Sequence, residues 1–154
     1  MRYNNFKSNA VAVIKGSEHY PDINGRVLFR QQKNGVLITA EIFGLPVDEK
    51  NCDGGIFAFH IHEGGECSGS GSDLFANAKG HYNPNNCPHP YHAGDLPPLI
   101  GNNGYAYMSV LSDRFTAREI IGRTVIIHLH PDDFHSQPSG NSGEKIACGV
   151  IAKT

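Results

Sequence analysis

Apolar and polar positions alternate in short runs along this chain. The runs predict strands over 10–16, 25–32, 36–45, 55–64, 104–113, 122–130 and 145–153. Turn residues separate them, and Lys33-Asn34-Gly35 predicts a hairpin with an Asn-Gly turn, the strongest short-range signal for that motif. Seven to eight short strands with such turns indicate an all-β fold, an antiparallel β-sandwich or flattened barrel.

Length and composition indicate the number of domains and the classes of partner to expect. The 154 residues, 39% of them hydrophobic, predict a single domain over 1–154 with one core. A net charge of −2 without a basic run predicts no nucleic acid partner, and the lack of a long apolar run predicts no membrane span. The first ten residues lack the apolar centre of a signal peptide. We therefore expect a cytoplasmic protein if the chain is complete, and an exported one if a leader was removed.

Two histidines stand two places apart in the predicted strand FAFHIHE. Residues i and i+2 of a strand share one face, so His60 and His62 project side by side. The strand alone leaves two interpretations open: a pair of polar residues on the wet face of a sheet, or a pair of metal ligands.

The segment from 64 to 104 is long, polar and without periodicity. It contains three histidines and an aspartate at close spacing: His81, His89, His92 and Asp95. Nitrogen and oxygen ligands of this kind suit tetrahedral Zn²⁺, and four protein ligands would close a structural site. The alternatives are a solvated polar loop or a disordered one.

A second set of histidines lies outside this loop. His60 and His62 share one strand face, and His128 lies in another predicted strand, TVIIHLH. Several imidazoles in an open arrangement favour Cu²⁺. Because an imidazolate can bind a metal through each ring nitrogen, His81, the first histidine of the zinc run, is the candidate to serve both sets.

The segments FHIHEGGEC, GHYNP, HAGDLP, GRTVIIH and GNSGEKIACGVI, in this order, resemble the copper,zinc superoxide dismutase family. The resemblance implies a Greek-key β-sandwich that converts superoxide to dioxygen and hydrogen peroxide with copper and zinc as cofactors. It implies these roles: copper ligands His60, His62, His81 and His128; zinc ligands His81, His89, His92 and Asp95; Asp132 as the carboxylate that joins a copper ligand to a zinc ligand; and a disulfide between Cys67 and Cys148. It also implies that His81 carries a proton during turnover.

Two departures from the family pattern affect these expectations. Lys145 stands where the family has an arginine over the copper, and lysine is a point charge without the planar fork of arginine. We expect Lys145 to attract superoxide, with the orientation of the anion open. Cys52 and Cys87 are extra cysteines, which either form a second disulfide or remain free thiols.

Other functions compete with dismutation. A weak or inactive copper- and zinc-binding relative, or a metal-storage protein, would keep the same ligands. A zinc enzyme that activates water could also use two strand histidines and a third from elsewhere. The oligomeric state stays open between a homodimer and a monomer.

Overall fold

The computed structural model describes residues 9–47 and 55–154, and these contain nine β-strands, one short 3₁₀ helix and no α-helix. The strands are β1 (Ala10–Gly16), β2 (Asn24–Gln32), β3 (Gly35–Phe43), β4 (Ile56–Phe57), β5 (Phe59–His62), β6 (Leu99–Ile100), β7 (Ala106–Ser112), β8 (Thr124–His128) and β9 (Lys145–Lys153); the 3₁₀ helix is η1 (Ala76–Ala78). None of the helices formed by the described residues is long and apolar enough to cross a membrane. The predicted all-β fold is confirmed.

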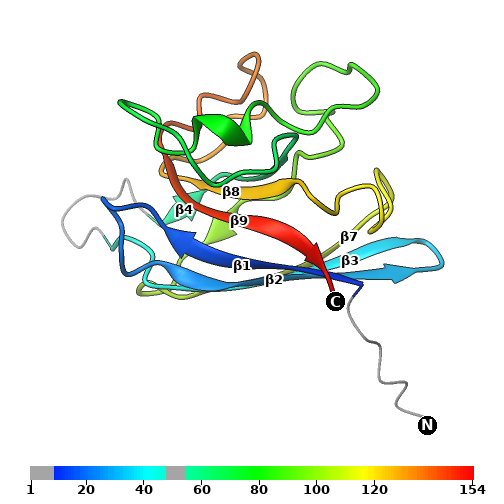
Figure 1. Cartoon of the computed structure of the whole chain (residues 1–154), viewed down its shortest axis with the longest axis horizontal. Helices are drawn as coiled ribbons and strands as arrows, with labels where there is room; N and C mark the ends of the chain where they lie inside the picture. Colours follow the sequence, from blue (N-terminus) through cyan, green and yellow to red (C-terminus); the bar gives the residue numbers. More distant parts are fainter. Residues whose placement is uncertain (1–8, 48–54) are drawn as a thin grey trace, which may run out of the picture.

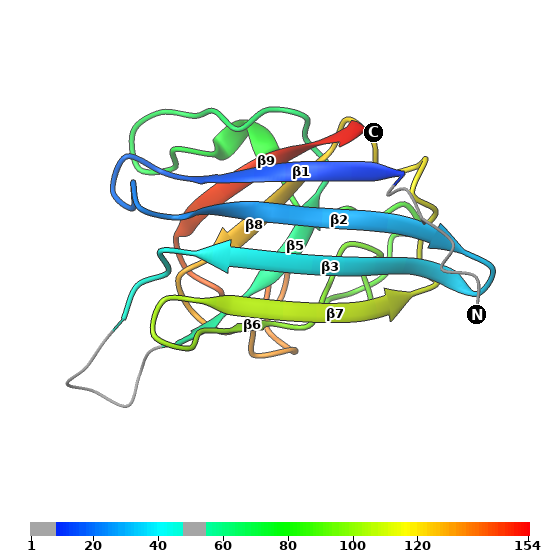
Figure 2. The ribbon, with the colours of Figure 1, turned by 90° about the horizontal axis from the view of Figure 1, so that it is seen from below.

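Seven strands form one antiparallel sheet in the order β5-β8-β9-β1-β2-β3-β7, and β4 pairs with β6 in a second, two-stranded sheet. The first three strands follow one another as neighbours, and β9 returns to lie beside β1, which is the Greek-key order. Figure 2 shows β1, β2, β3 and β7 side by side, with β8 and β5 crossing behind them at an angle. The sheet is therefore curled.

The core lies inside this curled sheet. Along β3, Val36, Ile38, Ala40 and Ile42 are fully buried while the residues between them are partly exposed, as the alternating pattern predicts. They belong to one cluster with Phe29 of β2, Phe59 and Ile61 of β5, and Val125 and Ile127 of β8. Both faces of β5 and β8 are buried. Figure 1 shows why: the long connections, coloured green and orange, gather beyond β8 on the outer side of the sheet.

Three details differ from the predicted strands. Gln32 pairs with Gly35, so the hairpin turn is Lys33-Asn34 rather than Asn-Gly, and Gly35 begins β3. A Cβ on Gly35 would lie 2.5 Å from the Ser112 carbonyl oxygen, so this glycine allows the close approach of β7. The predicted strand over 55–64 is broken at Ala58, whose N–H and carbonyl bond to His130 and His128.

The third difference is a strand inside the predicted loop. Leu99–Ile100 forms β6, which pairs with β4. Two residues are too few for an alternating pattern to be recognised in the sequence.

A disulfide between Cys67 and Cys148 fastens the connection after β5 to the last strand, β9, as the family resemblance implied. Cys148 packs in a small second cluster with Phe75, Ala78 and Ile126. The segment around η1 is thus held on the outer face of β8 and β9. Cys52 lies outside the described residues, so its pairing with Cys87 is not described; Cys87 is bonded to no cysteine of the described residues.

We predict that the double variant Cys67→Ala/Cys148→Ala loses about 4–5 kcal/mol of unfolding free energy in the metal-free protein, since the disulfide closes a loop of 81 residues. Guanidinium denaturation of both forms measures the loss. Cys87→Ala, which removes a partly exposed cysteine outside this disulfide, is the control and should change stability by much less. Equal stability of the double variant and the parent would contradict the prediction.

Candidate metal centre

His60 and His62 lie on the face of β5 that points away from the core, and they are 0% and 2% exposed. The interpretation as polar residues on a wet face is therefore wrong. Phe59 and Ile61, on the opposite face, anchor the strand in the core. The histidine face is covered by the connections from β5 to β6 and from β8 to β9 (Figure 1).

The free edge of β5 holds the predicted zinc loop. His62 forms an isolated bridge with His81, and His60 forms one with Asp95. Between them, Ile61 donates to the Gly94 carbonyl and accepts from the Tyr82 N–H, at 2.9 and 2.8 Å. The loop is thus ordered because two of its segments extend the sheet, and the alternatives of a solvated or disordered loop are wrong.

The first group of potential ligands is His60, His62, His81 and His128, whose ligand atoms all lie within 4.8 Å of one another. The Nδ1 atoms of His62 and His128 lie 2.7 and 3.2 Å from the carbonyl oxygens of Lys79 and Gly143. A carbonyl only accepts, so both Nδ1 atoms carry the proton and both Nε2 atoms present lone pairs. These two Nε2 atoms face each other at 3.3 Å, an arrangement that a cation between them would stabilise.

The other two members of this group also present free nitrogen atoms. His60 donates from Nε2 to Asp132 Oδ2 at 2.7 Å, which leaves its Nδ1 as a buried lone pair. Neither His60 Nδ1 nor His81 Nε2 has a hydrogen-bond partner among the described residues. Buried polar atoms without partners are rare, and here they converge on one point.

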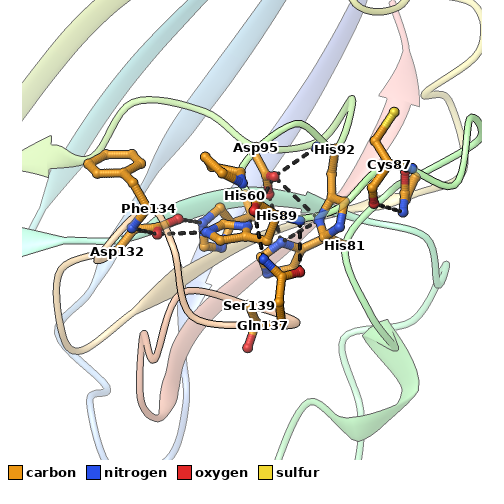
Figure 3. A network of polar contacts seen from close by, with 12 residues as sticks. His60, His81, Cys87, His89, His92, Asp95, Asp132, Phe134, Gln137 and Ser139 are labelled. Atoms are coloured by element: carbon orange, nitrogen blue, oxygen red, sulfur yellow. Dashed lines mark hydrogen bonds and ion pairs between the residues drawn. The ribbon is translucent and has the colours of Figure 1, made fainter.

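The second group is His81, His89, His92 and Asp95, with ligand atoms again within 4.8 Å of one another (Figure 3). The Asp95 carboxylate lies 2.7, 3.1 and 3.3 Å from the Nδ1 atoms of the three histidines. His89 donates from Nε2 to Asp132 Oδ1 at 2.8 Å, so its Nδ1 is a lone pair toward the group. Three nitrogens and one carboxylate form a set that suits zinc.

The two groups share His81, which directs Nδ1 toward Asp95 and Nε2 toward the first group. Asp132 joins them a second time, because its two oxygens accept from His60 and His89. The Phe134 N–H also donates to Asp132 Oδ1, at 2.7 Å. A Cβ on Gly140 would lie 2.1 Å from this oxygen, so only glycine leaves room for the carboxylate.

Burial keeps these imidazoles neutral. It lowers the pKa of His60 to about 4 and the pKa of His128 to about 3, and lowers that of His62 well below its ordinary value. Burial alone would raise the pKa of Asp132, but the hydrogen bonds from His60 and His89 outweigh it and the pKa lies below its ordinary value. Neutral imidazoles and an ionised carboxylate are the forms that bind metals. Both groups therefore fit the metals expected of them: copper for four imidazoles and zinc for the set with Asp95.

Three further residues of interest are not members of either group. Lys145 forms an ion pair with Asp73, with 2.7 Å between Nζ and Oδ2. His130 and His135 belong to neither group of potential ligands among the described residues.

Two side chains that support the zinc loop were missed from the sequence. The Gln137 amide donates to the His89 carbonyl and accepts from the His89 N–H, at 2.7 and 2.9 Å (Figure 3). Arg114 donates from Nη1 to the carbonyl oxygens of Pro90, His92 and Asp95, at 3.3, 3.1 and 3.5 Å. Both contacts join distant parts of the chain, and no local pattern marks either residue.

Fold and geometry together define a β-sandwich protein with two adjacent groups of potential metal ligands that share a histidine. Comparison with known proteins identifies the family of the chain. The family model described as copper/zinc superoxide dismutase (SODC) matches residues 23–151, so the chain belongs to the copper/zinc superoxide dismutase family.

Individual relatives are similar over most of their length. A protein of Aquifex aeolicus (strain VF5) named superoxide dismutase [Cu-Zn] 2 is 35% identical over 84% of this chain and 80% of its own. The superoxide dismutase [Cu-Zn] of Legionella pneumophila is 36% identical over 82% of this chain and 76% of its own. The solved structure of Cu/Zn superoxide dismutase from Brucella abortus superposes with a TM-score of 0.75, at 26% identity, over 92% of this chain and 98% of that one.

The buried histidines predict how the metal-free protein responds to acid. Burial lowers the folded-state pKa of His60 to about 4 and that of His128 to about 3. As the pH falls below about 6.5, these histidines therefore bind protons in the unfolded chain before they do so in the folded protein. The unfolding free energy should fall as the pH drops from about 6.5 toward 4, by roughly 2–3 kcal/mol per buried histidine. The stability contributed by Asp132, whose pKa is lowered, is lost only at lower pH.

Denaturant titration of metal-free protein between pH 7.5 and about 4.5 measures this dependence. His135→Gln is the control, because His135 is 79% exposed and its loss should leave the slope unchanged. An unfolding free energy that does not change over this pH range would show that the buried histidines do not cause the acid response.

Arg114 gives a separate prediction. Arg114→Gln should weaken zinc binding by about 10-fold or more, the usual effect of losing a residue that supports metal ligands. Competition with a chromogenic chelator measures the affinity. Arg118→Gln serves as a control, since Arg118 is an exposed arginine that lines a surface pocket with Gln31 and Lys153. Equal zinc affinity in Arg114→Gln and the parent would show that the three carbonyl contacts do not support the loop.

Proposed function

We propose that the protein converts superoxide to dioxygen and hydrogen peroxide at a histidine-bridged copper–zinc site. The observation that carries this proposal is the orientation of His81, whose two nitrogens face two different sets of potential ligands. Family membership supports it, because superoxide is the substrate of this family.

The proposed roles follow from which atoms are free. Copper would be held by His60 through Nδ1 and by His62, His81 and His128 through Nε2. Zinc would be held by the Nδ1 atoms of His81, His89 and His92 with Asp95. Copper, when bound, supplies one-electron redox chemistry in both directions, and zinc supplies a fixed charge without redox chemistry.

The chain's own residues supply position and protons. Two superoxide anions and two protons give one dioxygen and one hydrogen peroxide, so the site must deliver protons. His81 can hold one at Nε2 and donate it to the peroxide while Nδ1 stays directed toward Asp95. Asp132 keeps His60 and His89 in the required tautomers through its two hydrogen bonds.

Lys145 is proposed to orient the incoming anion. Its Cα is the register partner of His128, so it begins β9 directly beside a proposed copper ligand. A weakly active or inactive metal-binding relative is the alternative function, and it rests on this same residue, because lysine stands where the family has arginine.

The proposal predicts that purified protein supplied with both metals binds one copper and one zinc per chain and removes superoxide. His81→Gln should lower the rate by at least about 100-fold, since it removes both the shared ligand and the proton carrier. Metal analysis and a direct superoxide assay on the same sample measure both properties. His135→Gln, an exposed histidine outside both groups, is the matched control. Full metal loading without dismutation would favour the inactive relative.

A further inference from the structure

Lys145 does not stand as a free positive charge. Its ammonium lies 2.7 Å from Asp73 Oδ2 and 3.4 Å from the Phe75 carbonyl oxygen. The Lys145 side chain is 16% exposed and that of Asp73 is 43% exposed, so the pair lies at the surface with the lysine on the inner side. Asp73 is itself held in place, because its other oxygen accepts from the Phe75 N–H at 3.0 Å.

The pair lies beside the first group of potential ligands. Lys145 is the register partner of His128, one of the proposed copper ligands. The segment that carries Asp73 also supplies the Lys79 carbonyl that orients His62. The disulfide from Cys67 to Cys148 holds this segment against the strand that begins at Lys145.

The chemistry of the pair differs from that of an isolated cation. An ammonium has three N–H donors, and Asp73 and Phe75 take two of them in a fixed arrangement. One donor remains for a small anion. At longer range the carboxylate cancels most of the field of the ammonium, and that field is what draws anions toward a site.

We propose that Asp73 is a positioning residue that holds the Lys145 ammonium beside the copper group and limits its attraction for anions to short range. This inference rests on the proposed function and deepens it. It implies that the lysine, bound to a carboxylate, orients an arriving monoanion more than it accelerates its arrival.

A double-mutant cycle on copper- and zinc-loaded protein tests the proposal without turnover. The probe is azide, a small monoanion whose binding to Cu²⁺ is followed by its charge-transfer absorbance over a range of ionic strength. Asp73→Asn keeps the size of the side chain and a hydrogen-bond acceptor but removes the charge. At low ionic strength it should tighten azide binding about 3–10-fold and steepen the loss of affinity with salt.

The lysine variants complete the cycle. Lys145→Met leaves the Asp73 carboxylate unpaired, so azide should bind about 10-fold more weakly and the dependence on salt should flatten. In the double variant Asp73→Asn/Lys145→Met, the asparagine can only remove the repulsion between the Asp73 carboxylate and azide. Asp73→Asn should therefore tighten azide binding less in the Lys145→Met background than in the parent. The same four proteins should show the same order of salt dependence in kcat/KM for superoxide.

Controls separate this role from a structural one. Asp113→Asn makes the same change in net charge at an exposed position after β7 and should alter azide affinity by less than 2-fold. Copper content and thermal unfolding are measured for every variant, and Asp73→Ser replaces Asp73→Asn in the cycle if asparagine reduces copper loading.

Two results would overturn the proposal: an azide affinity and salt dependence in Asp73→Asn like those of Asp113→Asn, or an effect of Asp73→Asn that is as large without Lys145 as with it. Absence of dismutation in the loaded parent protein would contradict the proposed function instead, and the azide cycle would still decide the role of Asp73.

Discussion

The candidate metal centre depends on one constraint. Its buried imidazoles must be neutral, and the nitrogen lone pairs of each group must point toward the place where one metal ion would bind. Each of His60, His62, His89 and His128 has one ring nitrogen that donates to Asp132 or to a backbone carbonyl, and this fixes the tautomer. The other nitrogen is then left for a cation. Without a cation, facing lone pairs and unpartnered nitrogens in a buried space are unfavourable, so the protein stores in this arrangement a strong preference for bound metal.

The curled sheet supplies only part of this arrangement. Strand pairing places His60, His62 and His128 on neighbouring strands, β5 and β8, with their backbone fixed by the core behind them. The remaining ligands come from a loop with little regular structure, and the edge of β5 holds this loop in place by pairing with it at two points. Gln137 and Arg114 then fix the His89 and His92 backbones from two other connections. The geometry of the second group therefore depends on four separate parts of the chain.

The sequence predicted the strands and the potential ligands more fully than their supports, and there is a physical reason for the difference. The spacing of His60 and His62 on a strand, and of His89, His92 and Asp95 in one loop, is local and uses residue types that bind metals. Gln137 and Asp73 are ordinary surface residues, and they contact His89 and Lys145 across 48 and 72 residues. Only the folded topology brings such pairs together. The break at Ala58 and the two-residue strand β6 were missed for the same reason, since both arise from partners distant in sequence.

The segment from Cys67 to Lys79 shows how one stretch of chain can serve several parts of the centre at once. Its disulfide and the packing of Phe75 and Ala78 hold it on β8 and β9. Its end, at Lys79, has a φ of +61°, a left-handed backbone that lysine rarely adopts, and the carbonyl of that residue accepts from His62. Because the segment has little regular structure of its own, ordering it costs conformational entropy that the disulfide reduces in the unfolded chain. The orientation of His62 and the position of Lys145 therefore depend on the same tether, although the two residues lie on different strands.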